Sequence, residues 1–527
     1  MKKSHIENFR VNKHIVRLRT CRNQLHSTSI PLILFAMGLI AATGWTGKAP
    51  APKPNVIRNL QPFPNASGQA ATYSVNGDID ESGAFFQSLG ANGRSCATCH
   101  VASDGFGLSA QTAQSVFAST NGTDPLFSPV DGGNCSDAKQ GDPADHSLLL
   151  NHGLIRIALP VPANAQFTIK AVSDPYGCAL VTDPVTQQQT ISVYRRPLPA
   201  ANLGFLSAVM FDGRETVAPL NNPQTFAANL ITDLSQQAID ATTGHAQASA
   251  PPTSAQVSDI VNFELGLYSA QVSDNQAHNL DAHRAGGGPL NLSKQNYYPG
   301  INDSLGADPK GAAFNSLAFN IFDSWLNLKP DPGASGTNGS DDNGVAEARA
   351  KIAAGEQIFN TFPLTIGNVR GLNDNAALNR PTSFTGTCAT CHDSPNVGNH
   401  SLPLALDIGT GHSPAYETDP TLAAGLTQLS FPNVPVYEIT GCPNPFNAGQ
   451  IESFFTTDPG RALITGQCGD FNRTKGPILR GLAARAPYFH NGSAANLTEL
   501  VNFYNLRMQM NLTGEQKSDL IAFLNSL

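Results

Sequence analysis

Two segments of the chain space their apolar residues as an amphipathic helix does, residues 345–360 and residues 512–527. The apolar positions are Ile352, Ile358 and Phe359 in the first segment and Leu520, Ile521 and Leu524 in the second. Thr513 precedes Gln516 by three residues, which is the spacing of a capping box at a helix N-terminus. Both segments are therefore predicted to be helices, and the protein to be mostly α-helical.

A third apolar segment, residues 30–45, carries no charge and follows a strongly basic stretch, residues 1–29. A basic region before a short apolar run is typical of an export signal. The run is shorter than the roughly 20 residues that cross a bilayer comfortably. We expect a cleaved signal peptide over residues 1–47, with an uncleaved N-terminal membrane anchor as the alternative. Both outcomes place the protein in the periplasm.

Composition narrows the class of protein. Charged residues make up 14% of the 527 residues, below the roughly 25% of an average globular protein, and 47 Gly with 37 Pro predict many loops. An apolar share of 40% suffices for a core and argues against a disordered chain. The net charge of −8 argues against a nucleic-acid partner.

Two C-x-x-C-H motifs carry the strongest chemical signal. The first consists of Cys96, Cys99 and His100, and the second of Cys388, Cys391 and His392. Two thiols at this spacing attach covalently to the vinyl groups of one porphyrin, and the adjacent histidine binds the iron. A zinc site would need a second Cys or His pair nearby, and a redox dithiol would not explain the histidines. We therefore expect two covalently bound c-type haems.

The position of the motifs suggests two cytochrome c-like domains. The motifs lie too far apart for one cytochrome fold, and residues 330–344 have the composition of a linker. We predict a tether over residues 48–77 and haem domains over residues 78–329 and 345–527, with long loop insertions. The amphipathic segment 345–360 then precedes the second motif, and residues 78–90 are its counterpart before the first.

The other cysteines favour disulfides. Cys21 lies in the leader, and an even number remains for an oxidising compartment. The preferred pairing of the three that are possible joins Cys135 to Cys178 and Cys442 to Cys468, because each pair lies inside one haem segment. Four buried free thiols are the alternative.

Residues 476–504 (GPILRGLAARAPYFHNGSAANLTELVNFY) resemble the bacterial di-haem cytochrome c peroxidase family, which includes MauG-type enzymes. Residues 211–215 (FDGRE) resemble the family's W-D-G-R segment. The resemblance implies that peroxide reacts at the first haem and that the second haem transfers electrons. The chain is longer than typical members near residues 120–200, 280–340 and 400–460, and these insertions have no assigned role.

The resemblance also implies a second axial ligand for the haem of the second motif. Counting from the P-Y-F-H segment, the family's ligand position falls at Tyr504, where MauG-type enzymes have tyrosine and classical peroxidases have methionine. Tyrosine is a known haem ligand and favours ferric iron. Met508, Met510 and an open sixth position are the alternatives.

A distal acid–base is the remaining catalytic requirement. The family uses a glutamate some 20 residues after W-D-G-R, and this stretch of the chain has none. His245 is the nearest group able to move a proton near neutral pH. His146 and His152 compete with it. Arg214 is predicted to act as a propionate partner or distal donor, with a structural salt bridge as the alternative.

The chain departs from the family pattern at the residue between the haems and at the calcium ligands. Phe211 stands where the family has a tryptophan between the haems. The family also holds a Ca²⁺ between its domains, for which Arg485 and Pro487 would supply backbone carbonyls, but the side-chain amide ligand has no match.

Three functions follow from the resemblance. The first is a peroxidase that reduces hydrogen peroxide with electrons from a small redox protein, either a cytochrome c or a cupredoxin. The second is a MauG-type oxidase that acts on a partner protein or an organic substrate. The third is an electron-transfer cytochrome without enzymatic activity. Family members are usually homodimers. Loss of residues 1–47, with seven positive and one negative side chains, changes the net charge from −8 to −14.

Overall fold

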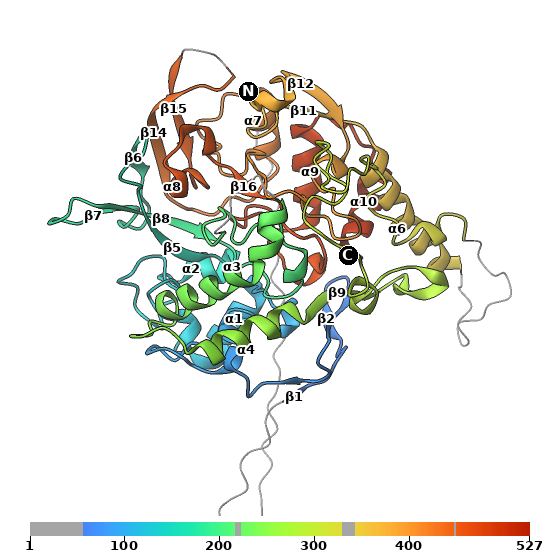
Figure 1. Cartoon of the computed structure of the whole chain (residues 1–527), viewed down its shortest axis with the longest axis horizontal. Coiled ribbons are helices and arrows are strands. Elements are labelled where there is room, and N and C mark those ends of the chain that lie inside the picture. The colour runs from blue at the N-terminus through green and yellow to red at the C-terminus, as the bar shows by residue number, and fades with distance from the viewer. Residues whose placement is uncertain (1–55, 217–222, 329–342, 447–449) are drawn as a thin grey trace, which may run out of the picture. The chain divides into compact units, whose positions relative to one another are not determined.

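The computed structural model describes residues 56–216, 223–328, 343–446 and 450–527 (Figure 1). All of them lie in the unit Pro54–Leu527, whereas the predicted export signal and most of the predicted linker are outside the described residues. The helices are α1 Ala110–Thr120, α2 Ser147–His152, α3 Pro223–Gly244, α4 Ser254–Leu265, α5 Pro289–Leu292, α6 Asn343–Thr361, α7 Pro420–Leu426, α8 Ala462–Thr465, α9 Leu497–Arg507 and α10 Gly514–Asn525. None of them is long and apolar enough to cross a bilayer.

The strands form several small sheets. They are β1 Val56–Ile57, β2 Phe63–Asn65, β3 Gly68–Ser74, β4 Ile79–Asp80, β5 Ile155–Pro160, β6 Thr168–Ser173, β7 Leu180–Thr182, β8 Gln189–Arg195, β9 Leu267–Asp274, β10 His278–Asn279, β11 Leu364–Gly367, β12 Ser383–Gly386, β13 Ala405–Leu406, β14 Val436–Pro443, β15 Ile451–Thr456 and β16 Thr474–Lys475. The prediction of a mostly α-helical protein is therefore wrong, because 31% of the structure is helix and 18% is strand.

The inserted segments supply much of the unexpected β-structure. β6, from the first insertion, pairs with β14, from the last one, and β14 pairs in turn with β15. A second sheet has the order β5-β8-β7. Side chains of both sheets share one core, in which the buried Tyr437 donates a hydrogen bond to the carbonyl oxygen of Ser192 at 2.6 Å. The insertions thus join the two halves of the chain.

The predicted disulfides are confirmed, and both lie by these sheets. Cys135 bonds to Cys178, and Cys442 in β14 bonds to Cys468. Each bond closes a loop within one half of the chain, which lowers the conformational entropy of the unfolded state.

The two helices predicted from apolar periodicity are confirmed as α6 and α10. Thr513 and Gln516 form the expected capping box at the start of α10. The helices pack against each other (Figure 1). A Cβ atom at Gly355 of α6 would lie 2.0 Å from the carbonyl oxygen of Asp519, so the absence of a side chain permits this close contact. Residues 78–90, the expected counterpart, form only β4 and a single 3₁₀ turn, η1 Ala84–Phe86.

Residues 56–74, which the composition assigned to a tether, belong to the folded unit. They form β1, β2 and β3, and β3 pairs with β9 along its length. The resulting sheet has the order β10-β9-β3-β2. Ala70 and Ala71 of β3 are buried, because β3 lies in the interior of this sheet.

Candidate haem-binding sites

The two C-x-x-C-H motifs adopt the same local structure. Each begins with a 3₁₀ turn, η2 Cys96–Thr98 in the first motif and η9 Cys388–Thr390 in the second. A capping box closes each turn, between Ser95 and Thr98 in one and between Thr387 and Thr390 in the other. The same residue spacing therefore produces the same backbone in both halves of the chain.

The four motif cysteines keep free thiols. Cys96, Cys99, Cys388 and Cys391 are half-buried and unpaired, whereas the other cysteines in the described part of the chain form disulfides. Each thiol pair borders a large cavity. This arrangement leaves the thiols available for covalent attachment of a porphyrin.

The motif histidines are oriented as iron ligands. The Nδ1 atom of His100 donates a hydrogen bond to the carbonyl oxygen of Phe106 at 3.1 Å, and that of His392 donates to Gly398 at 2.5 Å. A fixed Nδ1 proton leaves the Nε2 lone pair for a metal. Burial lowers the pKa of His100 to about 4 and also lowers that of His392, which favours the neutral, ligating form.

The cavities suit haem in volume and lining. They contain about 1590 Å³ and 1700 Å³ of space, open solvent included, and apolar side chains such as Leu206 and Val501 line them. Arg196, Lys475 and Arg485 line both cavities, and none forms an ion pair with a carboxylate of the described residues. Burial lowers the pKa of Lys475 to about 8. Haem propionates would compensate these buried positive charges.

Phe211 also lines both cavities and is 9% exposed. Its ring centroid lies 6.1 Å from that of His490, which belongs to the P-Y-F-H segment. The structure therefore places Phe211 in the wall between the two cavities, the position that the family alignment predicted.

His245 lies in the same cavity as His100, immediately after the end of α3. Its Nδ1 atom forms a short hydrogen bond with the carboxylate of Asp131. Asp131 is also paired closely with the guanidinium of Arg94, whose Nε donates to the carbonyl oxygen of Pro125 at 2.7 Å. The imidazole of His245 is 40% exposed, whereas the side chains of Asp131 and Arg94 are buried. The buried Asp131–Arg94 pair thus holds an accessible base in place.

The charge of this group is set by its contacts. Burial raises the pKa of Asp131, but the hydrogen bond from His245 and the charge of Arg94 outweigh burial and lower it overall. Asp131 therefore stays ionised at neutral pH and holds the Nδ1 proton of His245. The Nε2 atom of His245 is left to exchange a proton with a molecule in the cavity.

The competing histidines lie elsewhere. His146 is fully buried, its Nδ1 donates to the carbonyl oxygen of Gly132 at 2.8 Å, and it borders neither cavity. His152 ends α2 and also borders neither cavity. The geometry thus favours His245 among the three.

Arg214 lines the first cavity and is also engaged in a salt bridge. Its Nη1 atom lies 3.0 Å from an oxygen of Asp212, which in turn pairs with the buried Arg195. Both sequence-based alternatives for Arg214 are therefore compatible with its position.

Tyr504 extends from α9 into the second cavity. No hydrogen bond from the described residues engages its hydroxyl, and burial raises its pKa, with the neighbouring thiols Cys391 and Cys388 adding to the effect. Met508 and Met510 line the same cavity. All three candidate axial ligands therefore have access to it, and the assignment of Tyr504 stays a prediction.

One of the two carbonyl groups expected to bind Ca²⁺, that of Arg485, already accepts a hydrogen bond from a positively charged side chain. The carbonyl oxygen of Arg485 accepts a hydrogen bond at 3.0 Å from the guanidinium of Arg196. The same guanidinium contacts the carbonyl oxygens of His152 and Gly153 at 3.2 Å and 3.1 Å. The guanidinium of Arg196 thus already donates to this carbonyl oxygen, and its positive charge would repel a calcium ion bound there.

Sequence reasoning missed three residues of the first cavity. Asp131 and Arg94 support His245 from distant points of the chain. Glu264 of α4 also lines the cavity, and burial raises its pKa to about 8. Glu264 is the one acidic residue on the buried, otherwise apolar face of α4. This position in the apolar pattern could have identified it as a candidate functional residue.

Comparisons with known proteins agree with the motifs. The chain is 32% identical over 153 residues to a cytochrome-c peroxidase, IdrP2, of Denitromonas iodatirespirans, a region covering 27% of this chain and 37% of that protein. It is 39% identical over 93 residues to the cytochrome c peroxidase Ccp of Escherichia coli K12, covering 17% and 19%. The matches thus span little more than a third of these relatives at most. No protein-family model matches the chain.

A solved structure of a MauG-like protein associated with microbial copper homeostasis aligns with 67% of this chain and 79% of its own. The identity is 14% and the TM-score is 0.26, which supports no conclusion about the fold. The sequence matches and the two attachment motifs carry the assignment. The chain is similar to di-haem cytochrome c peroxidases, in agreement with the resemblance that its motifs indicated.

Proposed function

We propose that the protein is a di-haem peroxidase that reduces hydrogen peroxide with electrons from a small redox protein. The observation that carries this proposal is the hydrogen-bonded pair of His245 and Asp131 in the cavity of the first attachment motif. An electron-transfer cytochrome without enzymatic activity has no need of an accessible base supported by a buried carboxylate.

Two haems, held by the motif cysteines and by His100 and His392, would supply the redox chemistry of peroxide cleavage. The reduction consumes two electrons and two protons and yields two water molecules. The chain must therefore bind peroxide, exclude competing molecules and move protons within the first cavity.

His245 is the group that moves the proton. Its Nε2 atom would accept a proton from one oxygen of bound peroxide and return it to the other. Asp131 fixes the imidazole in the tautomer with the proton on Nδ1 and stabilises the imidazolium that forms, as a buried carboxylate does for other catalytic histidines. Arg94 keeps Asp131 in place by its charge and by its contacts to backbone carbonyls.

A MauG-type oxidase is the second candidate function. Two observations favour it: Phe211 in the wall between the cavities, and Tyr504 in the second cavity. A phenyl ring fills space between two porphyrins but is a poor radical relay. The electrons would then come from a partner protein or an organic substrate.

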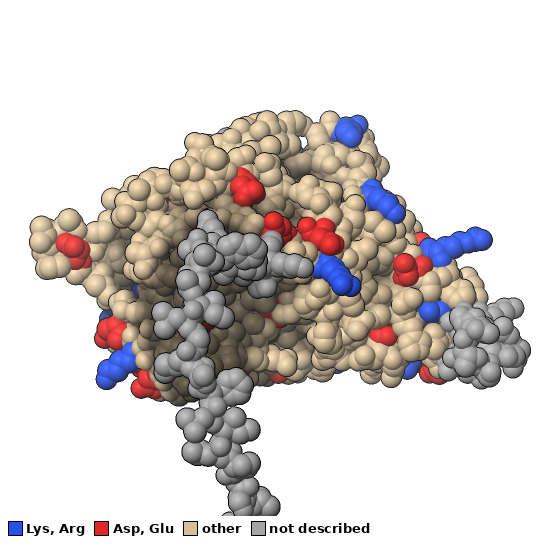
Figure 2. Space-filling model, turned by 90° about the horizontal axis from the view of Figure 1, so that it is seen from below, with Lys and Arg blue, Asp and Glu red and all other residues tan. Residues whose placement is uncertain are grey.

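The donor and the compartment are part of the same proposal. The net charge of −8, or −14 without residues 1–47, favours a donor with a basic or apolar docking face, such as a cytochrome c or a cupredoxin. Figure 2 shows a face on which charged side chains are few and of mixed sign, unlike a nucleic-acid-binding surface. We propose the periplasm as the compartment and a homodimer as the assembly, both by analogy with the family.

Steady-state assays distinguish the two enzymatic functions. Rapid peroxide-dependent oxidation of reduced cytochrome c or cupredoxin supports the peroxidase. A lasting change of the haem spectrum after peroxide addition, with little oxidation of either donor, supports the MauG-type oxidase. A haem spectrum that peroxide leaves unchanged contradicts both.

A further inference from the structure

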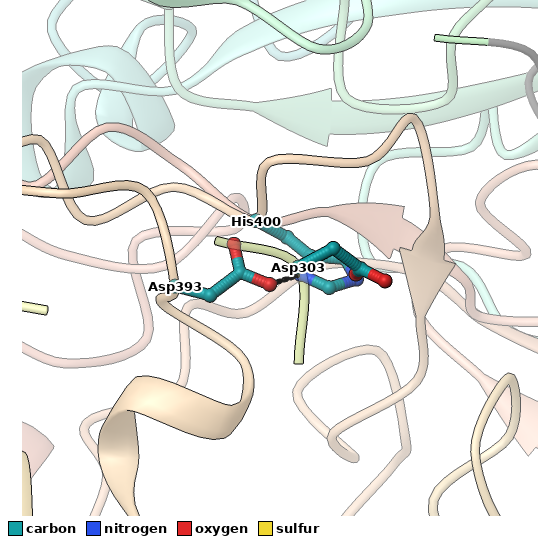
Figure 3. Close-up of side chains that lie close together, drawn as sticks. All are labelled: Asp303, Asp393 and His400. Atoms are coloured by element: carbon teal, nitrogen blue, oxygen red, sulfur yellow. Dashed lines mark ion pairs between the residues drawn. The ribbon is translucent and has the colours of Figure 1, made fainter. Parts of the chain in front are cut away.

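Three side chains that can bind a metal lie close together in the interior (Figure 3), and one of them, His400, also lines the second cavity. Asp303 comes from the loop between α5 and α6, Asp393 follows the motif histidine His392, and His400 lies seven residues farther along. Their exposures are 0%, 0% and 2%. One ligand atom from each residue lies within 4.8 Å of those from the other two.

Two polar atoms of this cluster have no hydrogen-bond partner among the described residues. They are Nε2 of His400 and Oδ1 of Asp303. His400 Nδ1 is paired with Asp393 Oδ2 at 2.9 Å, so the imidazole is held with Nε2 free. A buried polar atom without a partner is destabilising, so a ligand that contacts these atoms would stabilise the folded state.

The backbone holds both carboxylates in place. Asp303 Oδ2 accepts hydrogen bonds from the amides of Leu305 at 3.1 Å and Ala307 at 2.7 Å, which leaves Oδ1 without a protein donor. Asp393 Oδ1 accepts from the amide of Ser401 at 2.6 Å. The carboxylate of Asp393 is thereby fixed beside the imidazole of His400.

We propose that Asp303, Asp393 and His400 bind a divalent transition-metal ion, for which Zn²⁺ is the best match. One imidazole nitrogen and two carboxylate oxygens suit zinc, whereas calcium prefers oxygen ligands alone.

The ion would be structural, because all three side chains are buried and two of them, Asp303 and Asp393, border neither cavity. It would tie the loop around Asp303 to the second attachment motif. Two hydrogen bonds already join the same two segments. Asn302 Nδ2 donates to the carbonyl oxygen of Asp393 at 2.9 Å, and Ser304 Oγ donates to that of Thr390 at 2.6 Å. The ion would thus stabilise the segment that carries His392.

The competing explanation is a metal-free imidazolium between two carboxylates. Burial lowers the pKa of His400, but the charge of Asp393, its hydrogen bond to the imidazole and the charge of Asp303 outweigh burial and raise the pKa overall. However, among the residues that the structure describes, no ion pair or hydrogen bond joins Asp303 directly to His400. A bridging ion fills this gap, whereas an imidazolium does not.

Metal analysis of the holoprotein tests the site directly. After treatment with a chelator and titration with Zn²⁺ alone, the wild type should retain one zinc per two haems through gel filtration. The Asp303→Asn variant should retain at least tenfold less. Asp308→Asn is the matched control, because Asp308 is a buried acid of the same loop whose oxygens accept hydrogen bonds from Tyr298 and from the amide of Asn302.

A stability measurement keeps the test valid if Asp303→Asn does not fold. Zn²⁺ should raise the unfolding temperature of the chelator-treated wild type, because a ligand that binds only the folded state stabilises it. The effect should persist in Asp308→Asn. Absence of zinc retention and of any thermal shift in the wild type would overturn the proposal, as would equal zinc retention in Asp303→Asn and the wild type.

Discussion

The imidazole of His245 is hydrogen-bonded to the carboxylate of Asp131, a residue 114 positions earlier in the chain. The contact joins the end of α3 to the loop before α2 and sets the proton of the imidazole on Nδ1. The proposed peroxidase chemistry depends on this contact, since it makes Nε2 the atom that exchanges protons in the first cavity.

Substitution of the pair should separate proton transfer from orientation. His245→Ala should lower kcat/KM for peroxide by about 10²–10⁴-fold, the usual contribution of general acid–base catalysis. Asp131→Asn should have a smaller effect, about 10–100-fold, because it loosens the orientation of the imidazole without removing it. The control is His278→Asn, at an exposed position of β10. Steady-state assays in which His245→Ala retains wild-type kcat/KM would exclude His245 as the base.

Tyr504 should be visible in the spectrum of the second haem. If its oxygen binds the iron, Tyr504→Phe should change the absorption and electron paramagnetic resonance signals of that haem and leave those of the first unchanged. Met508→Leu and Met510→Leu are the matched controls, because both side chains line the same cavity. A response in one methionine variant, with none in Tyr504→Phe, would transfer the ligand role to that methionine.

The guanidinium of Arg196 should make the protein independent of calcium. Removal of calcium with EGTA should leave both peroxidase activity and unfolding temperature unchanged. Arg196→Ala should destabilise the protein by at least about 2 kcal/mol, because it leaves carbonyl oxygens of Arg485, His152 and Gly153 without a donor. Loss of activity with EGTA, restored by Ca²⁺, would show that calcium binds despite Arg196.

The buried Glu356 of α6 should make stability depend on pH. Burial raises its pKa to about 8, above the value of about 4.3 in an unfolded chain. The folded state therefore keeps a proton that the unfolded state loses, and this contribution is complete below pH 4.3 and lost as pH rises toward 8. The unfolding temperature of the wild type relative to Glu356→Gln should thus fall between pH 5 and pH 8. A difference that stays constant over this range, as expected for the exposed Glu347→Gln control, would contradict the assignment.

Local patterns predicted the parts of the structure that depend on neighbours in sequence. The capping box of Thr513 and Gln516 and helices α6 and α10 all appear as expected. The two disulfides join more distant cysteines and were predicted from the even number of cysteines in each half of the chain. The attachment motifs form matching turns because their capping residues lie within the motif itself.

Contacts between distant segments were not predictable from such patterns. The burial of β14 alternates along Val436–Ile439, yet its partner β6 lies in a different insertion, and no short-range signal pairs them. Asp131 is equally remote from His245. The alternation within β14 is a local strand signal, but it carries no information about the partner strand.

Rapid mixing of the reduced holoprotein with hydrogen peroxide, in the presence of reduced cytochrome c, tests the central claim most directly. The account predicts that the wild type oxidises two equivalents of cytochrome c per peroxide, and that His245→Ala does so at least a hundredfold more slowly. If peroxide leaves the haem spectrum of the wild type unchanged and no cytochrome c is oxidised, the first cavity is not a peroxidase site.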